Sequence, residues 1–118
     1  MTAYAELTTK KARIEHIRNQ IATNDRWALR ALLAIHKYQT ASEKASHSTI
    51  DHNGVGFNGA DAEILTSFAN VVVRRNVVEK MKRPDFNATQ VLTEKQIAIL
   101  RRRMVKYARQ LESISTNS

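Results

Sequence analysis

The sequence predicts an all-α fold, a single-domain bundle of about four helices with a glycine-containing loop between the second and third. Apolar residues recur at steps of three and four through most of the chain, which is the spacing of an amphipathic helix. The three glycines and the single proline fall between these stretches, where they mark loops. A length of 118 residues with 42% hydrophobic content fits one domain, residues 1–118, with one core.

The first two helices are predicted over residues 5–22 and 25–45. The first carries a thin apolar stripe of isoleucines: Ile14, Ile17 and Ile21. Asn24 is expected to cap the second helix, because an acidic residue follows it in the first turn. The apolar arc of the second helix is wide, so we expect this helix at the centre of the bundle, with Trp27 as a core anchor.

The loop DHNGVGFNG, Asp51–Gly59, is the most distinctive short stretch. Its glycine spacing invites comparison with phosphate-binding loops. However, it lacks the Lys-Ser/Thr pair of a Walker A sequence and follows no strand, so both nucleotide fingerprints are excluded. We expect Val55 and Phe57 to pin the loop to the core, and Asn58 to cap the next helix.

The third helix is predicted over residues 59–82. Its later part is rich in valine, which favours strands, but the valines do not alternate with polar residues and a lone strand would have no partner. A helix is therefore preferred there. Arg83-Pro84 ends it, because the residue before proline avoids the helical region.

The fourth helix is predicted over residues 94–112. Thr93 and Gln96 form a capping box, so the helix should begin at Glu94. Its buried stripe follows at helical spacing: Ile97, Leu100, Met104, Tyr107 and Leu111. Residues 113–118 are expected to be a frayed tail.

Composition excludes several kinds of chemistry. The absence of cysteine excludes disulfides, thiol catalysis and thiolate metal sites. His47, Asp51 and His52 are the only cluster with metal-like chemistry, and they lack a fourth ligand. We therefore expect no catalytic residues, no metal and no cofactor. No apolar run is long enough for a membrane span and the N-terminus lacks the core of a signal peptide, which predicts a cytoplasmic protein with no membrane partner.

Basic residues predict a binding function. The net charge of +8 favours a polyanionic partner such as nucleic acid or an acidic protein surface, although lysine and arginine also coat exposed helices that bind nothing. One group lies in the first helix: Lys10, Lys11, Arg13 and Arg18. A second lies at the end of the third helix: Arg74, Arg75, Lys80, Lys82 and Arg83. A third lies on the fourth helix: Arg101, Arg102, Arg103, Lys106 and Arg109. If the ends of the last two helices lie side by side, the second and third groups form one candidate surface for a phosphate backbone.

Two stretches resemble, as a pair, a motif of small proteins from phages and other mobile elements. They are NGVGFNGADAEILTSFA, residues 53–69, and LTEKQIAILRRRMVKYARQL, residues 92–111. The same motif is found in modules appended to helicase-like or primase-like DNA-processing proteins. Here the connector between the two stretches is longer than in that pattern. The resemblance implies a mobile-element origin, work near nucleic acid in the cytoplasm of a host cell, and no catalytic residues.

Three functional hypotheses remain open on the sequence. The first is a basic, non-enzymatic protein that binds DNA, RNA or a nucleic-acid-processing complex through its Arg/Lys face. The second is an inhibitor of a host defence complex, an anti-CRISPR or similar anti-defence factor, that acts by protein–protein binding. The third is a homo-oligomer that associates through Trp27 and residues 29–33. A helix-turn-helix is disfavoured, because neither long connector is a turn of about three or four residues.

Overall fold

The helices pack around one long central helix. The computed structural model of the chain describes residues 9–45 and 56–117, with the side chains of residues 9–40 and 56–115. Its elements are α1 (Lys10–Thr23), α2 (Asp25–Ala45), α3 (Ala62–Arg74), α4 (Val77–Lys80), η2 (Ala88–Gln90), α5 (Glu94–Met104), η3 (Val105–Tyr107) and α6 (Ala108–Asn117), where η denotes a 3₁₀ turn. The predicted all-α bundle is confirmed. Within the described residues it has five helices of ten or more residues, and α4 adds a single turn.

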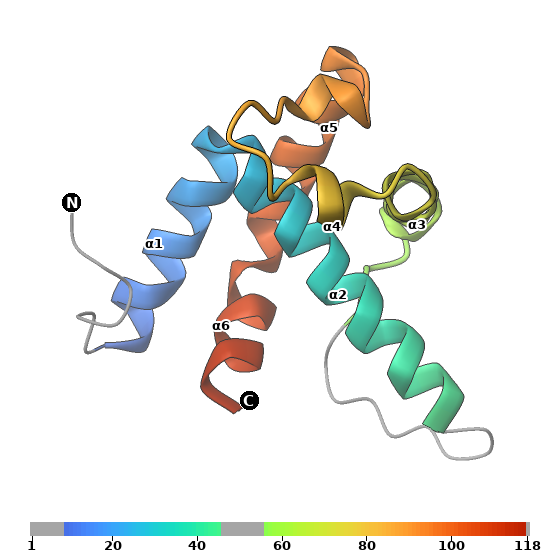
Figure 1. Cartoon of the computed structure of the whole chain (residues 1–118). Coiled ribbons are helices and arrows are strands. Elements are labelled where there is room, and N and C mark those ends of the chain that lie inside the picture. Colours follow the sequence, from blue (N-terminus) through green and yellow to red (C-terminus); the bar gives the residue numbers. More distant parts are fainter. Residues whose placement is uncertain (1–8, 46–55, 118) are drawn as a thin grey trace.

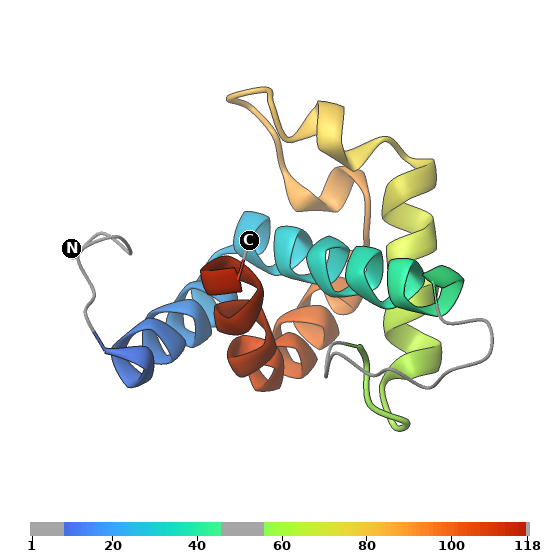
Figure 2. The same cartoon turned by 90° about the horizontal axis from the view of Figure 1, so that it is seen from below.

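Helix α2 crosses the middle of the molecule and contacts α1, α3, α5 and α6 (Figures 1 and 2). Its central position is the predicted one, and it follows from the wide apolar arc. Its large side chains Leu29, Leu32 and Ile35 are completely buried. The isoleucines of α1, the apolar stripe of α5 and the inner face of α3 join them in one hydrophobic core.

Local capping patterns fix where α1, α2 and α5 begin. Thr9 caps α1 by accepting a hydrogen bond from the Ala12 amide, so that helix starts at Lys10 and not at residue 5, and residues 5–8 lie outside the described part of the chain. Asn24 Oδ1 accepts from the amides of the second and third residues of α2, as predicted. At α5 both hydrogen bonds of the capping box are present, at 2.9 and 3.2 Å between Thr93 and Gln96.

The predicted third helix, residues 59–82, is wrong as a continuous element. It begins at Ala62, ends at Arg74, and is followed by a left-handed residue, Asn76, with φ 61° and ψ 45°. A continuous helix would place Val77 about 140° around the axis from the buried Val72. The break turns the chain so that Val77 becomes fully buried.

Asn76 sets up our first prediction. A left-handed backbone brings Cβ close to a carbonyl oxygen, which asparagine tolerates better than alanine and glycine avoids. Asn76→Ala should lower the free energy of unfolding by about 1 kcal/mol, whereas Asn76→Gly should leave it unchanged or raise it slightly. Urea unfolding followed by circular dichroism measures both. Equal losses for the two variants would show that the backbone conformation is not what the residue contributes.

The predicted fourth helix, residues 94–112, is divided by the 3₁₀ turn η3, and the expected frayed tail is also wrong. In 3₁₀ geometry side chains three residues apart lie on the same side, which aligns Lys106 with Arg103. Helix α6 then runs to Asn117, because Ile114 packs against the core and the buried Glu112 pairs with Arg13 of α1 at 3.0 Å.

Candidate nucleic-acid interface

A buried carboxylate lies at the start of α3, and basic side chains from the C-terminal part of the chain form ion pairs with it. Asp61 has no solvent exposure. Arg103 Nη1 lies 2.6 Å from Asp61 Oδ1, and Lys106 Nζ lies 2.7 Å from Oδ2. The Tyr107 hydroxyl donates to Oδ2 at 2.8 Å. Each carboxylate oxygen therefore meets at least one positive charge, which is what a carboxylate needs in order to stay ionised without water.

The protonation of this cluster follows from its contacts. Burial raises the pKa of the Asp61 carboxyl, but hydrogen bonds from Lys106, Tyr107 and Arg103 outweigh burial and hold the pKa below its ordinary value. Burial, together with donation to the Asp61 carboxylate, raises the pKa of Tyr107 to about 12, although the hydrogen bond from the Asn58 amide acts against it. Near neutral pH the cluster is an ionised carboxylate, two cations and a neutral phenol.

The loop before α3 is held by the same face of the C-terminal helices. Gln110 accepts from the Gly56 amide at 2.8 Å and donates to the Gly56 carbonyl at 3.1 Å. The Asn58 amide donates to the Tyr107 hydroxyl at 2.9 Å. The ring of Phe57 packs edge-on against Tyr107 and is partly buried, as expected, whereas Val55 lies outside the described residues. Residues 56–69 and 92–111 therefore contact each other.

These contacts correct the predicted single surface. Arg103 and Lys106 hold Asp61, so they act inside the fold, although their side chains remain 32% and 46% exposed. Arg101 Nη1 lies 3.3 Å from Asp25 Oδ1. Arg102 is exposed, on the side of α5 opposite its buried stripe. The cations of α5 therefore do not join those after α3 as one free group.

Arg109 belongs to a different surface. It lines an open hollow between α1 and α6 with five residues of α1: Lys10, Lys11, Ile14, Glu15 and Arg18. Glu15 pairs with Arg18 at 2.7 Å, so this α1–α6 surface, defined as Lys10, Lys11, Arg18 and Arg109, keeps a net positive charge. The remaining cation of the first basic group, Arg13, is paired with Glu112.

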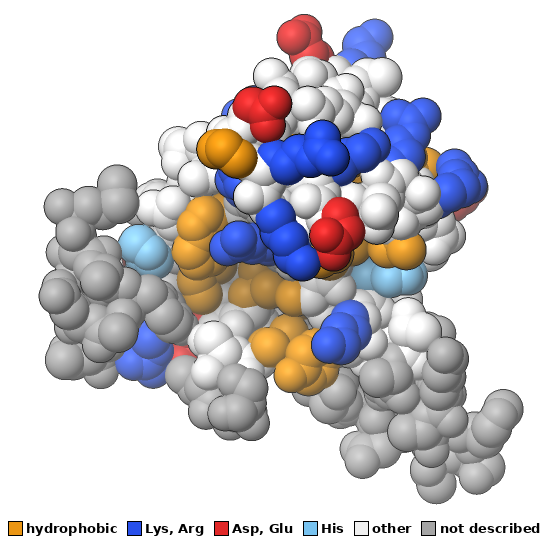
Figure 3. Space-filling view, viewed as in Figure 1, with side chains coloured by type: hydrophobic (Ala, Val, Ile, Leu, Met, Phe, Trp, Pro, Cys, Tyr) orange, Lys and Arg blue, Asp and Glu red, His pale blue; other side chains and the backbone are white. Residues whose placement is uncertain are grey.

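The second basic group lies at the end of α3, in α4 and just after it. Arg74, Arg75, Lys80, Lys82 and Arg83 fall within ten consecutive residues that include only one carboxylate, Glu79, and we name them the α3–α4 surface. Lys82 pairs with Glu79 at 3.0 Å with both side chains well exposed, and Arg75 donates to the Val91 carbonyl at 3.2 Å. Figure 3 shows Lys and Arg side chains gathered over α4 and α3 on this face.

An arginine that the sequence did not single out anchors this surface. Arg26 of α2 donates to the Met81 carbonyl at 2.6 Å and to the Arg83 carbonyl at 3.0 Å. Its guanidinium also lies 5.1 Å from the ring centre of Phe86, which packs against the core. The segment after α4 is thereby tied to α2. One general rule favours this contact: a positive side chain is stabilising near the free carbonyl groups at the C-terminal end of a helix, which here is α4.

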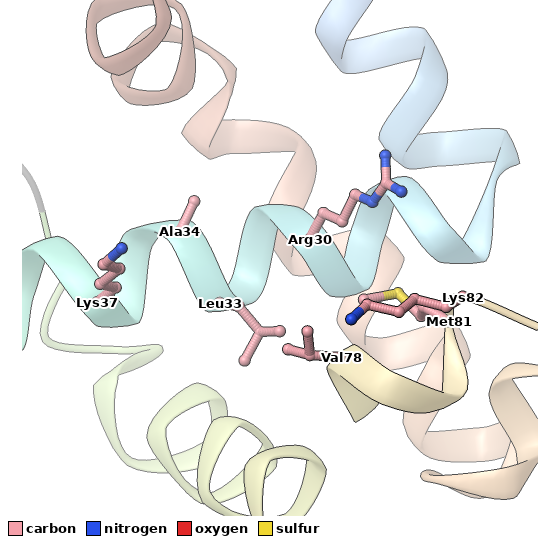
Figure 4. A pocket seen from close by; sticks show the side chains of 7 residues that line it. All are labelled: Arg30, Leu33, Ala34, Lys37, Val78, Met81 and Lys82. Carbon is pink, nitrogen blue, oxygen red and sulfur yellow. The ribbon is translucent and has the colours of Figure 1, made fainter. Parts of the chain in front are cut away.

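Two cations of α2, Arg30 and Lys37, border the α3–α4 surface. They line a hollow of about 410 Å³ between α2 and α4, together with Leu33, Ala34, Val78, Met81 and Lys82 (Figure 4). Sequence analysis did not group these two with the other basic residues. Their spacing of seven residues, which is two helical turns, was the pattern that predicts a shared face.

The comparisons with known proteins identify no family for this chain. The chain matches no protein-family model, no curated protein and no solved structure. Among the described residues no group of three or more His, Cys, Asp and Glu side chains is placed to hold a metal ion, and His47, Asp51 and His52 lie outside them. None of the described helices combines the length and apolar character that a bilayer crossing requires.

Proposed function

We propose that the protein is a small, non-enzymatic nucleic-acid-binding protein that holds phosphate groups on its α3–α4 surface. The observation that carries this proposal is the local excess of positive charge, five cations and one carboxylate in ten residues of helix end and turn. Glu79, the one carboxylate, pairs with Lys82 where both are exposed, so a phosphate can displace it at little cost.

Such a surface suits backbone recognition with little sequence preference. Cations spread along a turn can each meet a phosphate, and flexible lysines and arginines adapt to different strand geometries. The described part of the structure offers no exposed aromatic row on this surface that would stack bases. The resemblance to proteins that work near nucleic acid supports the same role, which would be performed in the cytoplasm of a host cell.

Titration with DNA tests the proposal. Purified protein would be titrated with a fluorescein-labelled DNA of 20 nucleotides, single-stranded or duplex, at 50 and 200 mM salt. If about three to five phosphates are contacted, the affinity for duplex should fall by about 40- to 500-fold between the two conditions. Binding of neither form at 50 mM salt, or binding that does not weaken with salt, would refute the proposal.

A second candidate function is inhibition of a host defence complex through protein–protein contact. The observation that favours it is the apolar part of the hollow between α2 and α4, from Leu33, Ala34, Val78 and Met81, which phosphate binding does not explain. Nucleic-acid titration separates the two functions, because an inhibitor that recognises only protein should not bind free DNA.

A further inference from the structure

Trp27, which the sequence predicted as a core anchor, packs against the core but is not part of its fully buried centre. Its side chain is only partly buried, it meets His16 edge-on at 6.0 Å between ring centres, and it lines a hollow of about 310 Å³. That hollow lies between α1, α2 and α6. Its other walls are mainly apolar, from Ile17, Ala31, Ala34, Leu111 and Ile114.

This hollow continues into the one between α2 and α4. Arg30 and Ala34 line both, so the two hollows adjoin along one face of α2. On the α4 side the apolar surface is extended by Leu33 and by Val78, which is 56% exposed and points toward Leu33 (Figure 4). Figure 3 shows hydrophobic side chains over the area where α1, α2 and α6 meet, below the basic group. We name this continuous surface, from Trp27 to Lys37 with Val78 and Leu111, the α2 face.

The charges on the α2 face have one sign. Among the residues that the structure describes, no carboxylate lines either hollow. Lys82 at the α4 edge is paired with Glu79, so the charge of this face comes from Arg30 and Lys37, which have no ion pair within residues 9–40 and 56–115. Arg30 and Lys37 are seven positions apart in the sequence, which corresponds to about 10.5 Å along the helix axis.

We infer that the α2 face binds an acidic amphipathic helix of a partner protein. A helix laid across an apolar groove buries residues at positions i, i+3 or i+4 and i+7. Carboxylates seven residues apart on its flank would match Arg30 and Lys37 in spacing and in sign. Nucleic acid fits this face poorly, because the described residues of its apolar floor offer no stacking ring other than the half-buried indole of Trp27. The inference does not rest on the proposed binding of nucleic acid.

A designed peptide serves as the probe, and Trp27, the only tryptophan of the chain, serves as the reporter. The acidic peptide would be an 18-residue helix with leucines at i, i+4 and i+7 and glutamates beside them. A second peptide would carry lysine in place of each glutamate. The acidic peptide should shift the Trp27 emission to shorter wavelength and bind at least about ten-fold more tightly than the lysine peptide. Equal binding of the two peptides, or no binding of the acidic one, would overturn the inference.

Paired variants locate the site. Ala34→Glu places a negative charge between the two hollows and should weaken the acidic peptide by at least about ten-fold. Ala98→Glu makes the same substitution at an exposed alanine of α5 and should have no effect. If circular dichroism shows that Ala34→Glu is unstable, Arg30→Glu, at an exposed position, replaces it and should weaken binding of the acidic peptide in the same way. A peptide that binds all variants equally, or Ala34→Glu losing DNA as well as peptide, would contradict a separate protein-binding face.

Discussion

Replacing Arg103 and Lys106 together by methionine should lower the free energy of unfolding by about 3–5 kcal/mol. Methionine keeps an unbranched side chain of similar length, so the change removes charge more than volume. Asp61 would remain completely buried, and within residues 9–40 and 56–115 the Tyr107 hydroxyl would be its only side-chain donor. A buried carboxylate without a cation is what makes the change severe.

Thermal and urea unfolding at pH 7 measure this loss, and the melting temperature should fall by roughly 10–20 °C. Lys95→Met with Arg102→Met is the matched control, because it removes two exposed cations of the same helix. That control should change the free energy of unfolding by less than about 0.5 kcal/mol. Similar losses in the two double variants would mean that net charge, and not Asp61, sets the stability.

In the Arg103→Met, Lys106→Met variant, the contribution of Asp61 to stability should depend on pH in the opposite sense from the wild type. In the wild type the pKa of Asp61 is lowered, so its contribution is present above pH 3.8 and is lost as the pH falls through the folded-state pKa. In the methionine variant, burial acts almost alone and should raise the pKa. Acidification then neutralises the stranded carboxylate and narrows the stability difference between variant and wild type. A difference that stays constant from pH 7 to pH 4 would be inconsistent with this mechanism.

The second large effect concerns binding. Arg74→Glu, Lys80→Glu and Arg83→Glu together should weaken DNA binding by about 100- to 500-fold at 0.1 M salt, because each lost phosphate contact removes about 0.9 logarithmic units of affinity there. A neutral version with glutamine at the three positions should reduce the salt slope by about three. Both are measured with the labelled DNA.

A charge-matched triple variant is the control for this result. Lys10→Glu, Lys11→Glu and Arg109→Glu change the net charge by the same amount on the α1–α6 surface. Their long-range effect is screened, since the Debye length is about 10 Å at 0.1 M salt. If this control lost affinity for DNA and the α3–α4 variant kept it, the DNA-binding site would be on the α1–α6 surface instead.

Features encoded by neighbouring residues were predictable. The capping box at Thr93 and Gln96 and the cap at Asn24 are formed by side chains within three residues of the backbone they bind, so sequence alone gave the starts of α2 and α5 correctly. The all-α fold and the central place of α2 followed from apolar periodicity. The break at Asn76 could not be predicted from apolar periodicity, because it depends on which face of the following turn meets the core.

The role of Asp61 was beyond the sequence for a different reason. Its partners lie 42 to 46 residues later, and an acidic residue near a helix start is ordinarily explained by the helix dipole. One pattern was available. Arg103, Lys106 and Gln110 recur at steps of three and four, which marks a polar stripe beside the apolar one. The five basic residues of this segment were interpreted as a free binding surface. Three of them are ion-paired, Arg103 and Lys106 with Asp61 before α3 and Arg101 with Asp25 at the start of α2.

Whether Asp61 organises this fold through Arg103 and Lys106 can be decided by adding Asp61→Asn to both backgrounds and measuring the free energy of unfolding at pH 7. In the wild type the substitution should lower it by about 2 kcal/mol, because charge-assisted hydrogen bonds are lost. In the Arg103→Met, Lys106→Met background it should raise it, because the stranded buried charge is removed. An equal loss in both backgrounds would show that the carboxylate and the two cations act independently.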